Sequence, residues 1–276
     1  MPELPEIETI VAGLNRLVIG KIIDDITWDW AKAFPNDPAV VDATIGRSIV
    51  KASRMGKAIL IDLDNTTTIL IHLKMTGQLV FQEADQEGPF PDKTTRVTLD
   101  FTDGSLLFFN DQRKFGWVKI LTSTELANNE FLQKLGPDPL SKTFTQALFT
   151  QRMSRRKDTS VKAALLDQTV VAGLGNIYCD EALFLAGIMP DRKVRTLSDQ
   201  DYRKLHRAIR KVLKRSVELG GSTRRNYLNV EGIRGHYLDE AFVYGRTGEP
   251  CRVCAQPILK IRVAGRGTHF CKHCQK

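Results

Sequence analysis

Residues 1–8 read Met-Pro-Glu-Leu-Pro-Glu-Ile-Glu, and the chain continues after them with apolar residues at helical spacing. Pro5 suits the first turn of a helix, and Glu6 and Glu8 complement the positive end of its dipole. The apolar residues of one face are Ile7, Ile10, Val11, Leu14 and Leu17. The stretch therefore predicts an amphipathic helix at the start of the chain.

The same eight residues also carry the groups for covalent chemistry. Proline is small enough for the initiator methionine to be removed, which leaves Pro2 as a secondary amine beside the carboxyl group of Glu3. An α-amino group titrates near pH ~7.7–8.0, so part of it is unprotonated at neutral pH and can attack an electrophilic carbon. The iminium that results is an electron sink, and Glu3 can move protons. From these residues alone, a helix start and a nucleophile are both open interpretations.

Period-2 alternation then replaces the helical period for about a hundred residues. Asp64-Asn65 and Asp103-Gly104 are typical of hairpin turns. Many short strands joined by such turns predict a β-sandwich or barrel closed by the N-terminal helix. The candidate strands are residues 21–27, 48–52, 58–63, 68–73, 78–81, 96–101, 105–109 and 117–121.

The net charge of +8 is distributed very unevenly over the 276 residues. Residues 1–132 carry 13 Lys and Arg against 19 Asp and Glu, a balance of −6, and residues 133–276 carry 27 against 13, a balance of +14. Such a basic half is typical of a nucleic-acid binder, and the alternative is a solvated surface that aids solubility. No apolar run approaches the ~18 residues of a membrane span. The N-terminus is acidic, unlike a signal peptide, so we expect a cytoplasmic protein without a membrane partner.

The basic half begins with a segment that is unsuited to a continuous helix. Leu135-Gly-Pro-Asp-Pro-Leu contains paired prolines and predicts a hinge or linker. A long helix is expected after a capping box formed by Ser198 and Asp201, and Gly220-Gly221 is expected to end it. Its apolar face consists of Tyr202, Leu205, Ile209, Val212 and Leu213.

Two glycines separate a further pair of predicted helices between residues 165 and 184. We expect a tight turn at Gly173–Gly175 and a second helix capped by Asn176. A helix N-terminus that glycines leave open to close approach can bind phosphate. The pattern is not a dinucleotide fingerprint, because no strand clearly precedes it and Tyr178 stands in place of the third glycine. A packed helical hairpin without a ligand is the alternative.

Two Cys-x2-Cys pairs near the C-terminus are separated by sixteen residues, a spacing typical of four-cysteine zinc sites. With four protein ligands such a Zn²⁺ is structural, and disulfides are the alternative. A β-hairpin is expected between the pairs, with Arg266 at its tip. His269 or His273 can replace a thiolate but is not needed, and Cys179 is expected to be a small buried residue. The expected ligands are Cys251, Cys254, Cys271 and Cys274.

Together these stretches resemble the bacterial formamidopyrimidine-DNA glycosylase family, part of the wider group that includes endonuclease VIII. The resemblance runs over nearly the whole chain. The matching motifs are Pro-Glu-Leu-Pro-Glu from Pro2, His72-Leu-Lys-Met-Thr-Gly, Asn110-Asp-Gln-Arg-Lys-Phe-Gly, the segment 167–181, Val243-Tyr-Gly-Arg and the four-cysteine finger.

The resemblance implies a multidomain α+β fold and a monomer. It implies an N-terminal β-sandwich catalytic domain with flanking helices at 1–132, a linker or hinge at 133–150, and a helix-two-turn-helix DNA-binding domain at 151–240. A zinc finger with a β-hairpin follows at 241–276. The implied partner is damaged double-stranded DNA, which would place the protein at the bacterial nucleoid.

The resemblance also assigns roles to single residues. Pro2 is the implied nucleophile at C1′ of the damaged nucleotide, Glu3 the acid that assists opening of the sugar ring, and Glu6 a further acidic residue of the site. Lys57 matches a lysine that contacts the DNA near the lesion; from the sequence alone it would be an ordinary lysine at a strand start.

A flipped-out nucleotide leaves a gap in the stack that the enzyme must fill. Met75, Arg113 and Phe115 resemble the family's wedge, in which they fill the void, bond the orphaned base and kink the stack. The remaining DNA contacts that the resemblance implies are Lys162, Asn176 and Arg266.

The implied activity is that of a bifunctional glycosylase and lyase. It would remove oxidised purines such as 8-oxoguanine and formamidopyrimidines, and then cleave the strand by β- and δ-elimination through a Schiff base. The sequence departs from the commoner family pattern in Asp-Gln-Arg-Lys-Phe-Gly, where Lys114 lacks the fork of an arginine, and in residues 228–238, where the family has a base-capping loop. Alternatives are an endonuclease VIII-like enzyme for oxidised pyrimidines and a non-catalytic zinc-finger DNA-binding protein.

Overall fold

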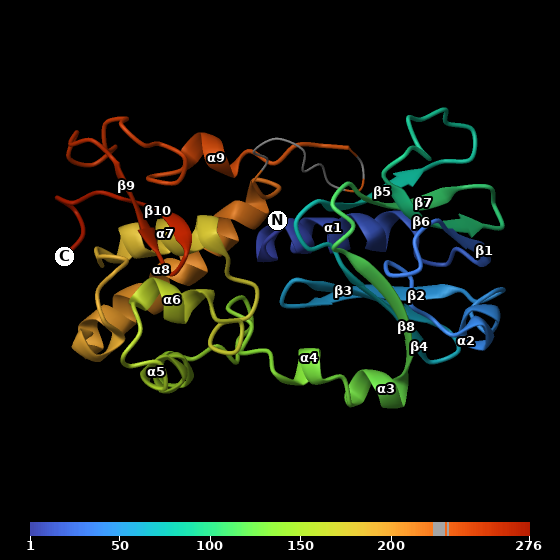
Figure 1. The fold of residues 1–276 in the computed structure, drawn as a ribbon, viewed down its shortest axis with the longest axis horizontal. Coiled ribbons are helices and arrows are strands. Elements are labelled where there is room, and N and C mark those ends of the chain that lie inside the picture. The colour runs from blue at the N-terminus through green and yellow to red at the C-terminus, as the bar shows by residue number, and fades with distance from the viewer. Residues whose placement is uncertain (223–229, 231) are drawn as a thin grey trace. The chain divides into compact units, whose positions relative to one another are not determined.

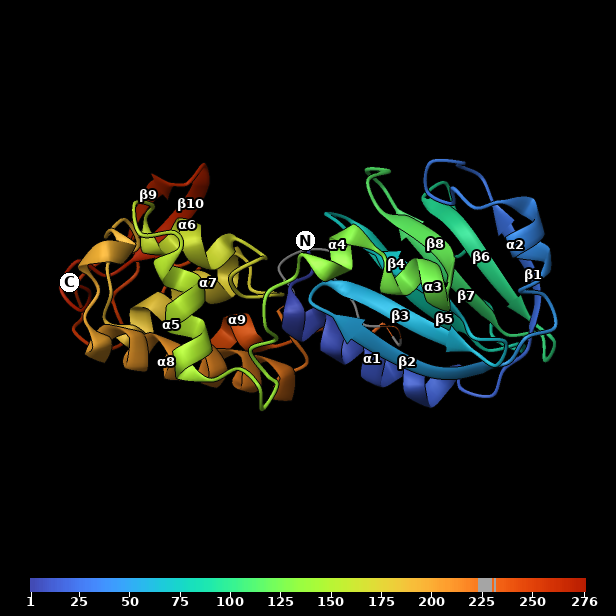
Figure 2. The same cartoon turned by 90° about the horizontal axis from the view of Figure 1, so that it is seen from below.

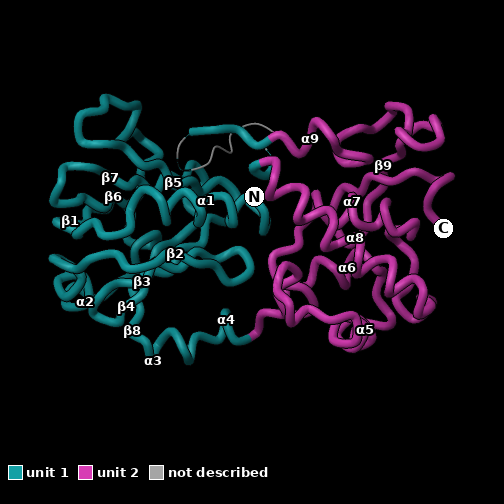
Figure 3. Tube along the Cα trace, turned by 180° about the vertical axis from the view of Figure 1, so that it is seen from behind, with its two compact units in different colours: residues 1–133, 220–235 teal, residues 134–219, 236–276 magenta. Residues whose placement is uncertain are grey.

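The computed structural model describes residues 1–222, 230 and 232–276, and it forms two compact units. Unit 1 consists of residues 1–133 and 220–235, and unit 2 of residues 134–219 and 236–276 (Figure 3). The chain therefore passes from unit 1 into unit 2, returns to unit 1 at Gly220, and ends in unit 2. Part of the expected base-capping loop, residues 228, 229 and 231, lies outside the described residues.

Unit 1 is a sandwich of two four-stranded antiparallel sheets (Figures 1 and 2). One sheet has the strand order β1-β6-β7-β5, and the other has the order β2-β3-β4-β8. All eight strands predicted from the alternating pattern are present. Their bounds are β1 Ile23–Trp28, β2 Ile49–Met55, β3 Ala58–Leu63, β4 Thr67–His72, β5 Gly77–Gln82, β6 Thr95–Phe101, β7 Leu106–Asp111 and β8 Trp117–Thr122.

The predicted N-terminal helix is α1, Leu4–Leu17, and it packs against β2 and β3. Its apolar face, including Ile7, Ile10 and Leu14, is fully buried in the core of unit 1. The side chain of Asn15 forms two hydrogen bonds with β2. Its Nδ2 donates to the carbonyl of Ala52 at 2.8 Å, and its Oδ1 accepts from the backbone amide of Ala52 at 3.0 Å. The C-terminal end of the helix is thereby fixed relative to β2.

The two predicted hairpin turns lie where the sequence placed them, between β3 and β4 and between β6 and β7. Three short helices of unit 1 carried no periodic signal, because a helix of four or five residues has barely one turn. They are α2 Pro38–Asp42, α3 Ser123–Ala127 and α4 Glu130–Gln133.

Unit 2 is helical and ends in a two-stranded hairpin. The predicted long helix begins with the expected capping box of Ser198 and Asp201, and its apolar face lies in the core of the unit. The elements are α5 Gln146–Ser154, α6 Val161–Leu166, α7 Asn176–Ala186, η1 Val194–Thr196, α8 Asp199–Glu218, α9 Tyr237–Glu240, β9 Leu259–Val263 and β10 Arg266–Phe270. The expected mixed α+β architecture is confirmed.

The proline-containing segment after α4 is packed onto unit 2. Gly136 donates its amide to the carbonyl of Gln168 at 2.7 Å, and the Pro137 carbonyl accepts from Ala172 at 3.1 Å. Phe144 is 1% exposed and lies in the core of unit 2. Most of the expected linker is therefore an integral part of the second unit. No helix among the described residues is long and apolar enough to cross a membrane.

Candidate functional site

The N-terminus belongs to unit 1, where Met1 is half exposed and Pro2 and Glu3 are buried. Glu3 is the N-cap of α1 and forms a reciprocal capping box with Glu6. The amide of Glu3 donates to Oε2 of Glu6 at 2.7 Å. Proline at the second helical position needs no hydrogen-bond acceptor for its nitrogen. The helix start and the expected reactive residues are thus one local structure.

Glu6 connects this structure to the returning segment of unit 1. Its Oε1 accepts from the backbone amide of Ser222 at 2.6 Å and from the Ser222 hydroxyl at 2.9 Å. Gly221 beside it has φ +87°, and a Cβ there would lie 2.9 Å from Oε1 of Glu6. A glycine is therefore required by both the backbone conformation and the close approach of the carboxylate.

The expected active-site residues of unit 1 gather around the α-amino group. Burial lowers the pKa of the Met1 amine, and the charges that act on it are those of Glu3, Glu6, Lys57 and Arg113. Lys57 is only 8% exposed and lies in the tight turn between β2 and β3, next to Gly56 with φ +59°. Charged residues from three separate parts of the sequence therefore act on one amine, and burial there favours its neutral, nucleophilic form.

The three expected wedge residues project from two neighbouring loops. Met75 is 41% and Phe115 53% exposed, and Arg113 is also exposed, with its guanidinium 4.7 Å from the centre of the Phe115 ring. Single exposed apolar residues are common on protein surfaces, whereas a group of them on neighbouring loops can mark a binding site. Their exposure agrees with insertion into a stack of bases and not with the core positions that hydrophobicity alone would suggest.

Asp111 organises the loop that carries Arg113 and Phe115. Its carboxylate accepts from the backbone amides of Arg113 at 3.2 Å, Phe115 at 2.7 Å and Gly116 at 2.7 Å, and from the hydroxyl of Thr76. Because Thr76 follows Met75 directly, this 1% exposed carboxylate holds both loops together. Sequence reasoning missed Asp111, although its place in the 110–116 motif was the available signal.

His72 is a second residue that sequence reasoning left without a role. Its ring packs in a cluster with those of Trp117 and Phe131, with centroid distances of 5.8 and 5.6 Å from His72 and 6.3 Å between the other two rings. Nδ1 accepts from the amide of Lys74, whose φ of +49° is left-handed. Burial, reinforced by the charges of Lys74 and Lys57, lowers the pKa of His72 from 6.5 to about 4. His72 therefore stays neutral and supports the backbone that leads to Met75.

This neutral histidine predicts a loss of stability in mild acid. Because the folded pKa lies below 6.5, the unfolded chain binds more protons between pH 6.5 and about 4. The contribution of His72 is complete above that window and is lost as the pH falls through it, by up to about 3 kcal/mol. Urea midpoints at neutral pH and near pH ~4.5 should differ less in a His72→Gln variant than in the parent chain. An equal acid shift in the two proteins would contradict this origin.

In unit 2 the turn before α7 differs from the prediction in one detail. Gly175, with extended backbone, is the N-cap of α7, and Asn176 is its first helical residue. The side-chain amide of Asn176 donates to the carbonyl of Gly267 at 3.0 Å, while its buried Oδ1 has no partner among the described residues. The expected capping role of Asn176 is thus wrong, because the helix already includes Asn176, whose side chain connects the helix to β10.

Lys162 does not fit the direct phosphate contact that was expected of it. Its side chain is 0% exposed, and its Nζ lies 2.5 Å from Oδ1 of Asp180 and 3.3 Å from the carbonyl of Gly267. Oδ2 of Asp180 accepts from the backbone amide of His269 at 2.8 Å. The lysine takes part in a buried set of contacts that joins α6, α7 and β10. The sequence could not reveal this pair, because Asp180 lies eighteen residues away.

A second buried carboxylate, Glu181, holds the chain that enters the finger. It accepts from the amides of Phe242, Val243 and Tyr244 at 2.8–2.9 Å and from the hydroxyl of Tyr237 at 3.2 Å. Burial raises the pKa of Glu181, although these four donors oppose the shift. Adjacent carboxylates at 180 and 181 therefore anchor β10 and the Val243-Tyr-Gly-Arg segment to the same helix.

The finger hairpin is tighter than predicted. Val263 pairs with Arg266, so the turn is the two residues Ala264 and Gly265, with φ of +50° and +71°. Positive φ at both positions is typical of a two-residue turn that matches the strand twist. Arg266 is exposed, but it is the first residue of β10 and not the tip of the hairpin.

The four cysteines fit a tetrahedral zinc ion. Their sulfur atoms all lie within 4.8 Å of one another, with 3.9 Å between Cys251 and Cys274 and 3.4 Å between Cys254 and Cys271. Four thiolates at ~2.3 Å from a zinc ion would be about 3.8 Å apart. His269 is bound to Asp180 and is not needed as a ligand. As expected, Cys179 is a buried residue outside the cluster.

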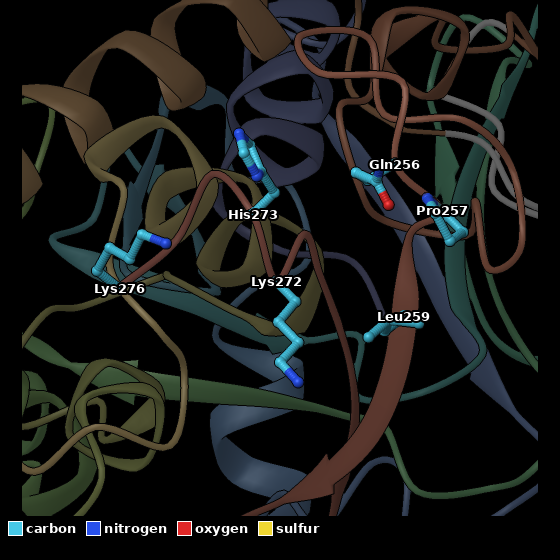
Figure 4. Close-up of a pocket in the computed structure, with 6 residues that line it drawn as sticks. All are labelled: Gln256, Pro257, Leu259, Lys272, His273 and Lys276. Carbon is cyan, nitrogen blue, oxygen red and sulfur yellow. The ribbon is translucent and has the colours of Figure 1, made fainter.

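A shallow cavity of about 310 Å³ lies on the finger and not beside the N-terminal amine. Figure 4 shows that residues from both Cys-x2-Cys regions contribute to it. Its lining residues are Gln256, Pro257, Leu259, Lys272, His273 and Lys276. None of the residues expected for catalysis is among them.

Family models cover most of the chain in three consecutive matches. They are the formamidopyrimidine-DNA glycosylase N-terminal domain at residues 1–118, the H2TH domain of the same glycosylase at 135–227, and the zinc finger found in FPG and IleRS at 248–276. The last match and the cysteine geometry together establish one structural zinc site.

Relatives of known name match over their full lengths. The formamidopyrimidine-DNA glycosylases of Geobacillus kaustophilus and Listeria innocua are 43% and 41% identical, with 100% of each chain covered. The crystal structure of the MutM (Fpg) protein from Thermus thermophilus matches with a TM-score of 0.90 and 38% identity, over 99% of this chain and 98% of that one.

Structures of DNA complexes are equally similar. A Lactococcus lactis FPG mutant bound to DNA containing Fapy-dG has a TM-score of 0.92 and 34% identity, with 100% of both chains covered. The complex between Lactococcus lactis Fpg and DNA containing an abasic site has a TM-score of 0.91 and 34% identity, with 99% of both chains covered. By sequence and by structure, this chain belongs to the formamidopyrimidine-DNA glycosylase family.

Proposed function

We propose that this protein is a DNA glycosylase and abasic-site lyase that removes oxidised purines from duplex DNA. The observation that carries the proposal is the partly buried N-terminal amine, on which the charges of Glu3, Glu6, Lys57 and Arg113 act. Relatives of the same length are named formamidopyrimidine-DNA glycosylases, and similar structures hold DNA with Fapy-dG or an abasic site. The proposed substrates are 8-oxoguanine and formamidopyrimidines, and the proposed location is with chromosomal DNA.

Pro2 is the proposed nucleophile once Met1 has been removed. Its nitrogen attacks C1′, the bond from C1′ to the base breaks, and the base departs with the bonding electrons. Glu3 protonates the ring oxygen, which opens the sugar and yields an iminium. Lys57 is proposed to contact the DNA near the lesion. Glu6 is proposed to position Glu3 through the capping box, while it also accepts a hydrogen bond from the amide of Ser222.

The iminium then serves as an electron sink for two eliminations. Loss of a C2′ proton expels the 3′ phosphate, and a second elimination expels the 5′ phosphate, so that a one-nucleotide gap with phosphate ends remains. Glu3 is the proposed group that moves these protons, because it is the carboxyl group next to Pro2. Met75, Arg113 and Phe115 are proposed to occupy the stack while the damaged nucleotide is outside it.

Unit 2 supplies the proposed phosphate contacts. The N-terminus of α7 with Asn176 and the exposed Arg266 of β10 are the candidate groups. Lys162 and Asp180 are proposed to act only as positioning residues, because their buried ion pair holds α7 and β10 in position. The four-cysteine zinc site fixes the hairpin that bears Arg266 and takes no part in bond breaking.

Replacement of Asp111 by asparagine should loosen the two wedge loops. An amide offers one acceptor oxygen where the carboxylate serves three backbone amides and a hydroxyl. We expect the variant to lose about 2–3 kcal/mol of stability. Base removal from duplex DNA should slow by about tenfold or more, with little effect on cleavage of a preformed abasic site.

Asp103→Asn is the matched control for this variant. Asp103 likewise caps a hairpin turn of unit 1, accepting from the amide and hydroxyl of Ser105, but it lies between β6 and β7. Urea unfolding and single-turnover excision by both variants are the measurements. Equal losses of excision in the two variants would show that Asp111 affects stability only.

Borohydride trapping on a duplex with 8-oxoguanine opposite cytosine tests the function itself. Trypsin should release Pro2–Arg16 as one peptide, so mass spectrometry locates the adduct unambiguously. DNA mass on this peptide is the expected result. An adduct on Lys57 would overturn the proposed nucleophile. Trapping only with an oxidised pyrimidine would indicate an endonuclease VIII-like enzyme, and no trapping with either duplex would indicate a non-catalytic DNA-binding protein.

A further inference from the structure

Helix α8 carries an unusual density of positive charge. Between Tyr202 and Val217 the sequence contains seven Lys and Arg residues and no Asp or Glu. The acidic residues of the helix are confined to its ends, at Asp199, Asp201 and Glu218. The proposed chemistry at the N-terminus and the proposed contacts of Asn176 and Arg266 use none of these seven cations.

Two of the seven have local partners. Arg215 pairs with Glu218 and Glu240, and Arg210 donates to the carbonyl of Ser141 at 2.9 Å. The other five are exposed, and none of them makes a hydrogen bond, ion pair or ring contact with any described residue. We name these five the α8 basic face: Arg203, Lys204, Arg207, Lys211 and Lys214.

Helical geometry places the five side chains on one side. Arg203, Arg207, Lys211 and Lys214 succeed one another at intervals of four, four and three residues, a stripe about 16 Å long. The opposite side of α8 is buried, with Leu205 and Ile209 0% exposed. The stripe therefore points away from the core of unit 2.

The α8 basic face lies on a different side of unit 2 from the finger hairpin. Helix α7 contacts both α8 and β10, and Figure 2 shows α7 between α8 and the β9–β10 hairpin. Arg266 belongs to that hairpin. A duplex held by the N-terminus of α7 and by Arg266 would thus leave the outer side of α8 uncovered by those contacts.

The composition of the face identifies the kind of partner. Like charges four residues apart destabilise a helix by ~0.2–0.5 kcal/mol per pair, and none of the five forms an ion pair with a described acid. A protein interface would need an apolar centre, and single-stranded DNA would need aromatic platforms. No large apolar residue of α8 is among the exposed ones. Closely spaced cations alone match the phosphates of duplex DNA, which present one charge per ~1.7 Å of helix axis.

We propose that the α8 basic face binds the backbone of a second segment of duplex DNA while the lesion-bearing segment occupies the proposed active site. The inference rests on the proposed function only for the first segment. Binding of the second segment is independent of sequence and of damage, and it depends strongly on salt. One molecule would thereby hold two duplex segments, so that it can pass between neighbouring parts of a chromosome.

Capture of a second duplex tests this directly. Full-length protein is loaded on an immobilised short duplex with an abasic-site analogue, and a labelled undamaged duplex is then added. The parent protein should retain the label, and the quadruple variant R203Q/R207Q/K211Q/K214Q should retain about tenfold less. The log–log slope of capture against salt concentration should weaken by about one unit for each phosphate that the variant no longer neutralises.

The matched control removes four exposed cations elsewhere, as K32Q/K51Q/K93Q/K142Q, and should capture like the parent. Cleavage of a short lesion duplex reports separately on folding and on the proposed function. No capture by the parent, or equal losses in the two quadruple variants, would overturn the proposal. Stronger competition by polyglutamate than by duplex of equal charge would also overturn it, in favour of an acidic protein partner.

Discussion

Replacement of Pro2 by glutamine is expected to abolish strand cleavage at oxidised purines. A bulky residue at position 2 prevents the removal of Met1. The α-amine then belongs to Met1, one residue further from the site, and it is a primary amine and not the secondary amine of proline. Glutamine has no nucleophile to replace it. We expect the single-turnover rate to fall by at least about 10³-fold, which corresponds to about 4 kcal/mol of barrier. No borohydride adduct should form on the first tryptic peptide.

Pro2→Ala is the control that separates the amine from the proline ring. Alanine is small enough for removal of Met1, so a primary amine remains at the same position. It forms an imine that must be protonated before it withdraws electrons, and trapping should persist at a reduced rate. Both variants should have the same melting temperature as the parent, because α1 begins only at Leu4 and its hydrogen bonds to β2 are made by Asn15. Trapping by Pro2→Gln at the parental rate would remove Pro2 from the mechanism.

The elements that the sequence predicted correctly are those with local periodic signals. Eight strands and the helices α1 and α8 emerged from apolar spacing, and the capping box at Ser198 located the start of α8. The motif resemblance led to the family, and burial, together with the charges of Lys57 and Arg113, which are far apart in sequence, lowers the pKa of the N-terminal amine. Short helices such as α2 lacked enough turns to show a period.

What the sequence concealed depends on contacts between distant residues. The resemblance made Lys162 a candidate DNA contact, but only the fold shows that it pairs with Asp180 inside unit 2. The return of the chain to unit 1 is equally invisible, because Glu6 and Ser222 are 216 positions apart. Asp111 is one aspartate among many until the three amides and the hydroxyl that it binds are known.

In unit 2, two buried carboxylates attach the zinc finger and the segment that leads into it to helix α7. Asp180 holds β10 through His269, and Glu181 holds the segment 242–244. Phe184, one turn further along α7, packs in a small core with Val243, Ile258 and two of the cysteines. The finger is therefore attached to α7 by its polar and apolar contacts, while its internal structure depends on the zinc site.

Loss of zinc is accordingly expected to remove DNA binding while unit 1 stays folded. Cys251→Ser takes away one of four thiolates, and structural zinc in small domains supplies ~10–16 kcal/mol of apparent binding energy. Without it, the small core around Cys251 and Cys271 loses its order, and Arg266 loses its fixed position on β10. Affinity for a duplex with an abasic-site analogue should fall by at least about 100-fold, or about 2.7 kcal/mol. Fluorescence anisotropy measures the affinity for the duplex, and metal analysis measures the zinc content of the variant.

Cys179→Ala is the matched control, because it also removes a buried thiol from unit 2 but lies outside the metal cluster. It should keep its zinc and its affinity and lose only about 1 kcal/mol of stability. The sandwich of unit 1 has its own core and sheets, so Cys251→Ser should retain the near-ultraviolet signal of the three tryptophans, Trp28, Trp30 and Trp117, all of which lie in unit 1. Parental affinity in a zinc-free Cys251→Ser protein would show that the contacts of α6 and α7 position the hairpin without the zinc site.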